Sequence, residues 1–192
     1  MEAFLVSTGA VAIAEIGDKT QLLAFVLAAR FRKPIPIVAG ILVATLCNHA
    51  LAGAFGTWLM TATGPDLLRS ILGLSFLAMA AWALIPDTVD DATPSVANGL
   101  GVFGTTLVAF FLAEMGDKTQ FATVALAAKY AAPTAVVAGT TLGMMIANVP
   151  AVFLGERLLE RVPMRLVHVG AATLFAALGV ATLSGAGARF GV

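Results

Sequence analysis

Two eight-residue stretches carry the side chains most able to do chemistry in this chain. Residues 14–21 read Ala-Glu-Ile-Gly-Asp-Lys-Thr-Gln, and residues 113–120 read Ala-Glu-Met-Gly-Asp-Lys-Thr-Gln. Each stretch places two carboxylates and one ammonium inside a run that is otherwise apolar for about twenty residues, the length of a membrane span. A charge at the bilayer centre costs about 2.5–3.5 kcal/mol on insertion scales. Charges placed there twice with one spacing indicate a binding site.

The net charge of the two stretches indicates which ligand such a site would prefer. If the stretches meet, four carboxylates contribute −4 and two lysines contribute +2, which leaves −2 in a medium of low dielectric constant. One divalent cation or two protons would neutralise that charge, as exchange of a divalent metal for protons requires. The acids are Glu15, Asp18, Glu114 and Asp117, and the charge-balancing lysines are Lys19 and Lys118.

Other polar side chains extend the set of candidate cation ligands or proton-relay groups. Carboxylate, hydroxyl and amide oxygens suit hard cations such as Ca²⁺, Mn²⁺ or Mg²⁺ better than Zn²⁺ or Cu⁺. The single histidine among them is explained equally well as a residue hydrogen-bonded within the helix bundle. These additional candidates are Thr20, Gln21, Asn48, His49, Thr119, Gln120 and Asn148.

A purely structural account of the same charges is the main alternative at this point. In a continuous helix, residues three and four positions apart share a face, so each glutamate would neighbour its own aspartate and lysine. The pairs Glu15–Lys19 and Glu114–Lys118 would then only fix how the helices pack. That account leaves both aspartates unpaired at membrane depth, which is costly. We therefore favour a binding site, in which the lysines orient and partly neutralise the acids.

One glycine lies between the two acids of each stretch, Gly17 in the first and Gly116 in the second. Small residues let transmembrane helices approach closely. The two helices are therefore expected to cross at their glycines and to bring the carboxylates together. The sequence leaves open whether each helix also unwinds there.

The composition is typical of an integral membrane protein. The chain has 192 residues, of which 59% are hydrophobic and 11% charged, and its mean hydropathy is +0.96. Soluble domains carry about 25% charged residues, so this chain has too few to solvate a globular surface. The formal net charge of zero gives no electrostatic reason to expect a nucleic-acid partner. Cys47, the single cysteine, excludes an internal disulfide and is interpreted as a small packing residue.

The apolar runs predict an all-α protein with six transmembrane helices. A spanning helix needs about 20 residues, and clusters of basic residues, proline and glycine separate six suitable runs. We expect no cleavable signal peptide, because the first run leads directly into the first charged stretch. The predicted spans are residues 3–29, 35–61, 68–85, 100–128, 134–154 and 166–187.

The two halves of the chain repeat at an offset of 99 residues, which relates residue 14 to residue 113 and Pro34 to Pro133. Each half holds three predicted spans, so the second half must enter the membrane in the opposite sense. This is the inverted repeat of many secondary transporters, whose sites lie at the midplane between repeats. The predicted units are a first repeat at 1–86, a cytoplasmic linker at 87–99 and a second repeat at 100–192.

Loop charge predicts the orientation, because cytoplasmic loops are enriched in lysine and arginine. The loops after spans one and five carry six basic residues, whereas the opposite side carries three, which favours a cytoplasmic location for the first group and termini outside. The first group is Arg30, Arg32, Lys33, Arg157, Arg161 and Arg165, and the second is Arg69, Lys129 and Arg189.

The duplicated motif, Glu-φ-Gly-Asp-Lys-Thr with φ apolar, resembles the transmembrane protein 165 family of six-helix Ca²⁺/Mn²⁺:H⁺ exchangers, whose layout is similar to the lysine-exporter superfamily. The resemblance covers nearly the whole chain, and both motifs are complete. It implies cation/proton antiport without a cofactor, with Glu15, Asp18, Glu114 and Asp117 in the family's cation-site positions. The short chain is similar to bacterial manganese exporters, which implies export of Mn²⁺ across a bacterial plasma membrane.

Two other functions remain alternatives on sequence grounds. An exporter of a small cationic organic solute, such as a basic amino acid, would use the carboxylates against an ammonium group. A membrane enzyme would need a cluster of metal ligands or a nucleophile at depth, and only His49 suggests one, so we expect no enzyme. The expected partners are the lipid bilayer, divalent ions and protons. A homo-oligomer and the choice between Mn²⁺ and Ca²⁺ stay open.

Overall fold

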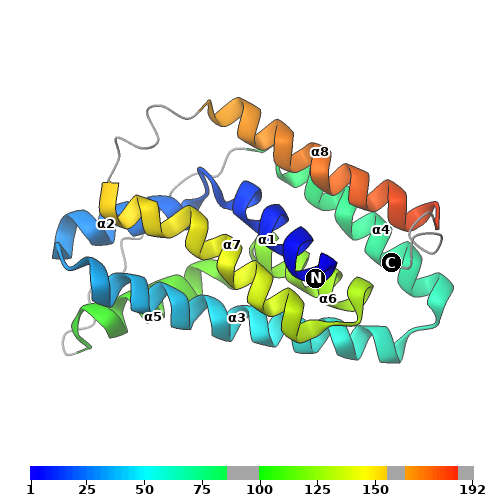
Figure 1. The fold of residues 1–192 in the computed structure, drawn as a ribbon, viewed down its shortest axis with the longest axis horizontal. Helices are drawn as coiled ribbons and strands as arrows, with labels where there is room; N and C mark the ends of the chain where they lie inside the picture. Colours follow the sequence, from blue (N-terminus) through cyan, green and yellow to red (C-terminus); the bar gives the residue numbers. More distant parts are fainter. Residues whose placement is uncertain (86–99, 155–162, 186–192) are drawn as a thin grey trace.

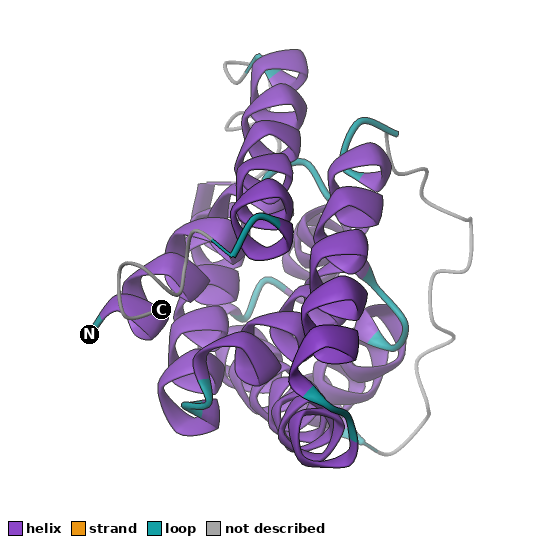
Figure 2. Cartoon of the chain, turned by 90° about the vertical axis from the view of Figure 1, so that its right-hand side faces the viewer, coloured by secondary structure: helices purple, strands orange, loops and turns teal. Residues whose placement is uncertain are grey.

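The computed structural model describes residues 1–85, 100–154 and 163–185, and every regular element in these ranges is an α-helix (Figure 1). Figure 2 shows the same helices as a bundle seen from the side. The predicted all-α class is therefore confirmed for this part of the chain. The helices are α1 (Glu2–Glu15), α2 (Lys19–Phe31), α3 (Pro34–Ala62), α4 (Pro65–Trp82), α5 (Gly101–Glu114), α6 (Lys118–Tyr130), α7 (Pro133–Leu154) and α8 (Met164–Leu183).

Three of the described helices, α3, α7 and α8, are long and apolar enough to cross a membrane, and α5 is a shorter apolar helix. Large apolar side chains, among them Leu46, Phe55 and Trp58, are exposed on the outside of the bundle. Such a surface suits lipid better than water. Cys47 is also exposed on this surface, so its interpretation as a small packing residue finds no support among the described contacts.

The two predicted spans that contain the motifs are not continuous helices, an outcome that the sequence had left open. Residues 3–29 divide into α1 and α2, and residues 100–128 divide into α5 and α6. The physical reason lies at the motif glycines, whose φ angles are +82° at Gly17 and +78° at Gly116. Glycine adopts this left-handed conformation without the steric penalty that a Cβ imposes. Each motif therefore unwinds its helix.

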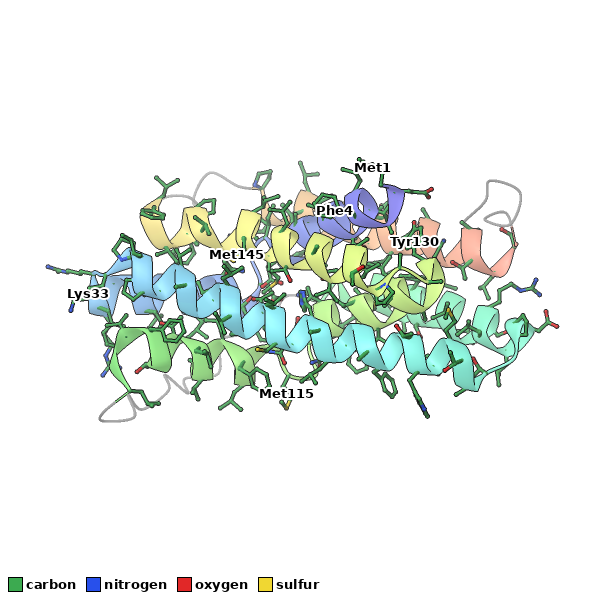
Figure 3. All side chains as sticks on the ribbon, turned by 60° about the horizontal axis from the view of Figure 1, so that its bottom comes forward. Met1, Phe4, Lys33, Met115, Tyr130 and Met145 are labelled. Atoms are coloured by element: carbon green, nitrogen blue, oxygen red, sulfur yellow. The ribbon has the colours of Figure 1, made fainter. Side chains whose placement is uncertain are left out.

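The helices that follow each break end in the same way. α2 ends at Arg32 with φ +52°, and α6 ends at Ala131 with φ +50°. Pro34 and Pro133 then start α3 and α7, because a proline in the first turn lacks only a hydrogen bond that the helix could not make there. Lys33, between Arg32 and Pro34, lies at one end of the molecule (Figure 3).

The remaining predicted spans agree with α3, α4, α7 and α8 to within a few residues at most ends. α4 and α8 begin two to three residues earlier than predicted and end three to four residues earlier. The predicted linker at 87–99 and the basic residues Arg157 and Arg161 lie outside the described residues.

The two long helices α3 and α7 lie side by side along the length of the molecule (Figure 1). α3 also packs against α5 and α6, whereas α7 packs against α1 and α2. Each long helix therefore supports the broken helix of the other half. α4 and α8 pair with each other at one side, where α4 contacts α6 and α8 contacts α1.

The buried apolar side chains form two clusters, which lie on opposite sides of the breaks. One cluster joins α1 and α6 to α4 and α8 around Phe76 and Phe175. The other joins α2 and α5 to α3 and α7 around Ile41 and Phe110. Since α1 and α5 precede their breaks and α2 and α6 follow theirs, the polar motifs lie between the two clusters.

Two glycine-to-alanine substitutions test the close packing of α3 on α6. A Cβ at Gly56 would strike the carbonyl oxygen of Val124 on α6, whereas a Cβ at Gly9 of α1 would meet no neighbouring element of the described chain within 4 Å. We expect Gly56→Ala to destabilise the protein by about 1–3 kcal/mol, as overpacking does. Gly9→Ala should be neutral or stabilising by up to about 1 kcal/mol. Thermal unfolding in detergent measures both, and equal midpoints would contradict this packing.

Candidate metal centre

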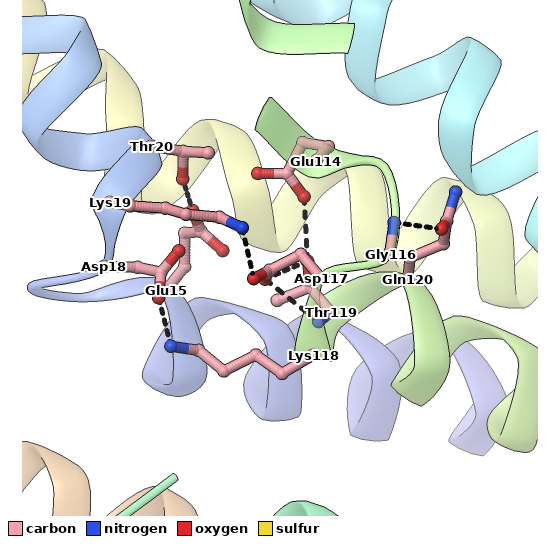
Figure 4. Close-up of polar contacts among 10 residues, drawn as sticks. All are labelled: Glu15, Asp18, Lys19, Thr20, Glu114, Gly116, Asp117, Lys118, Thr119 and Gln120. Carbon is pink, nitrogen blue, oxygen red and sulfur yellow. Dashed lines mark hydrogen bonds and ion pairs between the residues drawn. The ribbon is translucent and has the colours of Figure 1, made fainter. Parts of the chain in front are cut away.

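The helix breaks place all four motif acids at helix ends that face one another (Figure 4). Glu15 and Glu114 are the last residues of α1 and α5, and Asp18 and Asp117 are the N-caps of α2 and α6. Aspartate is favoured at an N-cap because unpaired N–H groups and the positive end of the helix dipole lie there. The C-terminal ends of α1 and α5 present the opposite, negative ends, which favour a cation.

Three of these acids form a cluster of the size that one metal ion needs. Glu15, Glu114 and Asp117 each offer a carboxylate oxygen, and these atoms lie within 4.8 Å of one another. Two oxygens bound to one Ca²⁺ ion, at about 2.3–2.6 Å each, lie at most about 5 Å apart. All three side chains are buried. The cluster joins both halves of the chain, as the crossing of the two motifs predicted.

The two lysines pair across the halves, not within them. The ammonium of Lys19 lies 2.9 Å from Asp117 Oδ1, and that of Lys118 donates to Asp18 Oδ1 (Figure 4). The alternative in which Lys19 and Lys118 pair with the glutamates of their own motifs is therefore wrong. It assumed a continuous helix, and the break separates each glutamate from its lysine.

The two lysines beside the cluster differ in how exposed they are. Asp18 lies outside the trio and receives the Lys118 ammonium, and both side chains are buried. The Lys19 side chain is 33% exposed, although its partner Asp117 is buried. The cluster is therefore less enclosed on the side of Lys19 than on the side of Lys118.

Each glutamate is oriented by the threonine of its own motif. Thr20 donates its hydroxyl proton to Glu15 Oε1, and Thr119 donates to Glu114 Oε2 at 2.9 Å. The other oxygen of each glutamate is buried and has no hydrogen-bond partner among the described residues. Buried carboxylate oxygens normally have partners, so these two are the atoms most available to a cation. The threonines therefore serve here as donors to the acids.

The motif glutamines point their amide oxygens at the backbone. Oε1 of Gln21 accepts from the N–H of Gly17, and Oε1 of Gln120 accepts from that of Gly116, both at 2.8 Å. Sequence reasoning grouped these glutamines with the candidate ligands and missed this role. The signal that could have revealed it is their identical position, four residues after each glycine.

The polar residues of the two long helices lie outside the carboxylate trio. Asn48 on α3 donates to the carbonyl oxygen of Phe111 at 3.0 Å, and Asn148 on α7 donates to that of Met144 at 3.1 Å. His49 is fully buried, and neither ring nitrogen has a hydrogen-bond partner among the described residues. The sequence alternative of a hydrogen-bonded histidine therefore finds no support in this part of the chain.

Met115 does not contribute a sulfur ligand. Its side chain is 55% exposed and points away from the bundle (Figure 3). The side chains gathered at the breaks thus offer oxygen to a ligand, and oxygen ligands favour hard divalent cations.

An all-α chain with a buried carboxylate cluster and an apolar outer surface has the features of an ion-handling membrane protein. The family described as "Divalent cation/proton antiporter GDT1" matches residues 3–91 and 102–189. The chain belongs to this family. Its members are transporters, so the expectations of antiport and of no enzymatic activity are confirmed at the level of the family.

Individual relatives cover most of the chain. A protein of Vibrio cholerae named "Putative manganese exporter" is 49% identical over 183 residues, which cover 95% of this chain and 90% of the relative. A GDT1-like protein of Synechocystis sp. is 30% identical, with 91% and 93% covered. GDT1-like protein 3 of Oryza sativa is 26% identical, with 94% and 73% covered. No solved structure matches this chain.

The crossed ion pairs predict unequal effects of removing the two lysines. Lys118→Met removes the ammonium that contacts the buried Asp18 carboxylate, so we expect a loss of about 3–5 kcal/mol of stability. Lys19→Met also leaves a buried acid, Asp117, without its ammonium, but Lys19 is itself 33% exposed, so we expect a smaller loss of about 1–3 kcal/mol. Adding Asp18→Asn to Lys118→Met should recover most of the loss. Unfolding midpoints in detergent test this order, and equal losses for the two lysines would contradict it.

Proposed function

We propose that this protein exchanges a divalent cation, Mn²⁺ or Ca²⁺, for protons and exports Mn²⁺ from a bacterial cytoplasm. The observation that carries the proposal is the buried trio Glu15, Glu114 and Asp117, to which both motifs contribute, in a chain of an antiporter family. The name of the Vibrio cholerae relative favours manganese as the exported ion.

In the proposed site, the trio binds the ion and Asp18 supplies the fourth carboxylate. The acids contribute −4 and Lys19 and Lys118 contribute +2, so the site has a net charge of −2, which one divalent ion or two protons would neutralise. The threonine hydroxyls of both motifs, with His49 and the buried Oδ1 of Asn148, are candidate ligands or proton-relay groups around this set.

We further propose that the chain is an inverted repeat of six spans, with units at 1–86 and 100–192 joined by the linker at 87–99. α1 with α2, and α5 with α6, would each count as one broken span. Support comes from the two motifs, which have the same backbone conformation at their glycines, aspartate N-caps and left-handed helix ends. The basic residues after α2 favour that end of the protein in the cytoplasm, with the termini outside and the bacterial plasma membrane as its location.

Alternating access is the transport mode that this architecture supports. The two motifs have nearly the same sequence but unlike surroundings. A Cβ at Gly17 would meet Met164 of α8, whereas a Cβ at Gly116 would meet no atom of another described element within 4 Å. A transporter built from two equivalent halves has such unequal halves in any state that opens to one side only.

Reconstitution of the purified protein into liposomes tests the exchange. We expect Mn²⁺ added on one side to move inward while protons move outward, and Ca²⁺ to compete with Mn²⁺. Glu15→Gln and Glu114→Gln should each reduce exchange by at least about a hundredfold, because each removes a carboxylate from a buried site. Glu2→Gln, at the exposed start of α1, is the matched control.

Two results would count against this assignment. Near-normal transport by either motif variant would mean that the site belongs to one half only. Proton-coupled movement of a basic amino acid, without any response to Mn²⁺ or Ca²⁺, would instead support an exporter of cationic organic solutes.

The proposed competition between metal and protons fixes the sign of the pH dependence. Protonated carboxyls no longer attract a cation, so apparent Mn²⁺ affinity should fall as the pH falls from about 9 to about 5. Release of two protons per metal gives a slope of up to about two logarithmic units per pH unit. Equilibrium binding in detergent measures the slope, which should be shallower in Glu114→Gln. A flat profile would exclude direct competition.

A further inference from the structure

Each motif glutamine joins its helix break to the long helix of the other half. We propose that Gln21 and Gln120 are positioning residues, acting as two latches that hold the motif carboxylates in their binding geometry. The tests of this inference that measure Mn²⁺ binding rest on the proposed function. The hydrogen bonds from which it is argued do not depend on that function. They comprise one hydrogen bond to the break and one to the facing helix for each glutamine.

The first hydrogen bond of each latch spans the helix break, from the glycine N–H to the glutamine amide oxygen. A glycine at the break has no regular helical partner for its N–H, and a side-chain acceptor can take that place. Gln21 lies one turn into α2 and returns its amide oxygen to Gly17 N–H at 2.8 Å. Gln120 does the same for Gly116 at 2.8 Å. The left-handed glycine and the start of the next helix are thereby fixed on either side of the N-cap aspartate.

The second hydrogen bond of each latch joins the glutamine to the long helix of the other half of the chain. The Gln21 Nε2 group donates to the carbonyl oxygen of Ala147 on α7 at 2.8 Å, and that of Gln120 donates to Asn48 Oδ1 on α3 at 3.4 Å. Residues 48 and 147 differ by 99, the same offset that relates the two motifs. Equivalent glutamines thus reach equivalent positions on the two long helices, which a chance packing contact would not reproduce.

The two latches differ in the chemistry of their anchor. Ala147 offers a main-chain carbonyl, which no side-chain substitution removes. Asn48 offers its side chain, which also donates to the carbonyl oxygen of Phe111 in the last turn of α5. That carbonyl is near the break, because Met115 N–H bonds to Leu112 O and no longer continues the α-helical pattern. Asn48 therefore holds both sides of the second break, α5 through Phe111 and α6 through Gln120.

This geometry opposes a ligand role for the glutamines. Their amide oxygens accept from the backbone, and their amide nitrogens are donors, which do not bind cations. Each amide oxygen already uses one of its two lone pairs for the glycine N–H, so a metal could share it only through the second lone pair. Their effect on the cation is therefore expected to pass through the position of the neighbouring glutamate and aspartate.

Substitution by methionine and by glutamate separates the latch from a ligand. Gln21→Met and Gln120→Met keep the side-chain length but remove both hydrogen bonds. Gln21→Glu and Gln120→Glu keep an acceptor for the glycine, add an oxygen ligand and lose the donor to the facing helix. We expect all four variants to weaken equilibrium Mn²⁺ binding in detergent by about tenfold, the scale of one lost buried hydrogen bond. Wild-type or tighter binding by the glutamate variants would overturn the latch and assign the glutamines as ligands.

Amide hydrogen exchange supplies a readout that needs neither metal nor transport. Gln21→Met should accelerate exchange only in the peptide that contains residues 15–21, and Gln120→Met only in the peptide that contains 114–120. A protein that is merely less stable would exchange faster throughout. Unchanged exchange in both motif peptides would overturn the proposal, whatever the metal affinity.

A double-substitution cycle tests the asymmetry of the anchors. If Gln120 acts through Asn48, the loss of Mn²⁺ affinity from Gln120→Met should be much smaller in an Asn48→Ala background, whereas the loss from Gln21→Met should be unchanged there. Thr57→Ala is the control on α3, because the Thr57 hydroxyl donates to Gly53 of its own helix and to no other residue in the described part of the chain. Additive losses for Gln120 and Asn48 would overturn the second latch. If the wild-type protein does not exchange metal for protons, the proposed function is wrong. Amide hydrogen exchange of the motif peptides would still show whether Gln21 and Gln120 act as latches.

Discussion

The structure depends on keeping four buried carboxylates compatible with a low-dielectric interior. Each uncompensated charge there would cost several kcal/mol, so the protein must neutralise the group from within or with a ligand. Two lysines provide half of the compensation, and they do so across the halves, Lys19 to Asp117 and Lys118 to Asp18. Because each pair needs both repeats, the same interaction that tolerates the charges also joins the halves at the candidate site.

The crossed pairing is possible only because both motif helices are broken. A continuous helix would direct each lysine to the glutamate one turn before it. With the break, the glutamates end α1 and α5 and the aspartates begin α2 and α6, so two helix N-termini and two helix C-termini meet at one place. The N-termini stabilise the aspartates, whereas the C-termini favour a cation beside the glutamates. The glycine conformation thus governs both the fold and the electrostatics.

Much of this arrangement could be predicted from residue types and spacing, but the breaks could not. The apolar runs located the helices, and the duplicated acids located the carboxylate cluster, because both signals depend only on local sequence. Gly17 and Gly116 are compatible with a close helix crossing and with a left-handed turn, and the sequence does not decide between them. The error about the lysine partners followed directly, since residues four apart share a face only in an unbroken helix. The same assumption hid the role of Gln21.

The differences between the two halves lie mainly outside the motifs. They would therefore determine the relative energies of the two access states. The motif sequences differ only at Ile16 and Met115, so two access states related by exchange of the halves would have nearly equal energies if the motifs alone decided. Energy differences must then come from the surroundings. These include Met164 over Gly17 and the contrast between Ala147 and Asn48 as anchors. A ligand shifts such an equilibrium only through contacts that differ between the two states. The residues around the motifs, more than the carboxylates themselves, are therefore where the preferred state of the protein would be set.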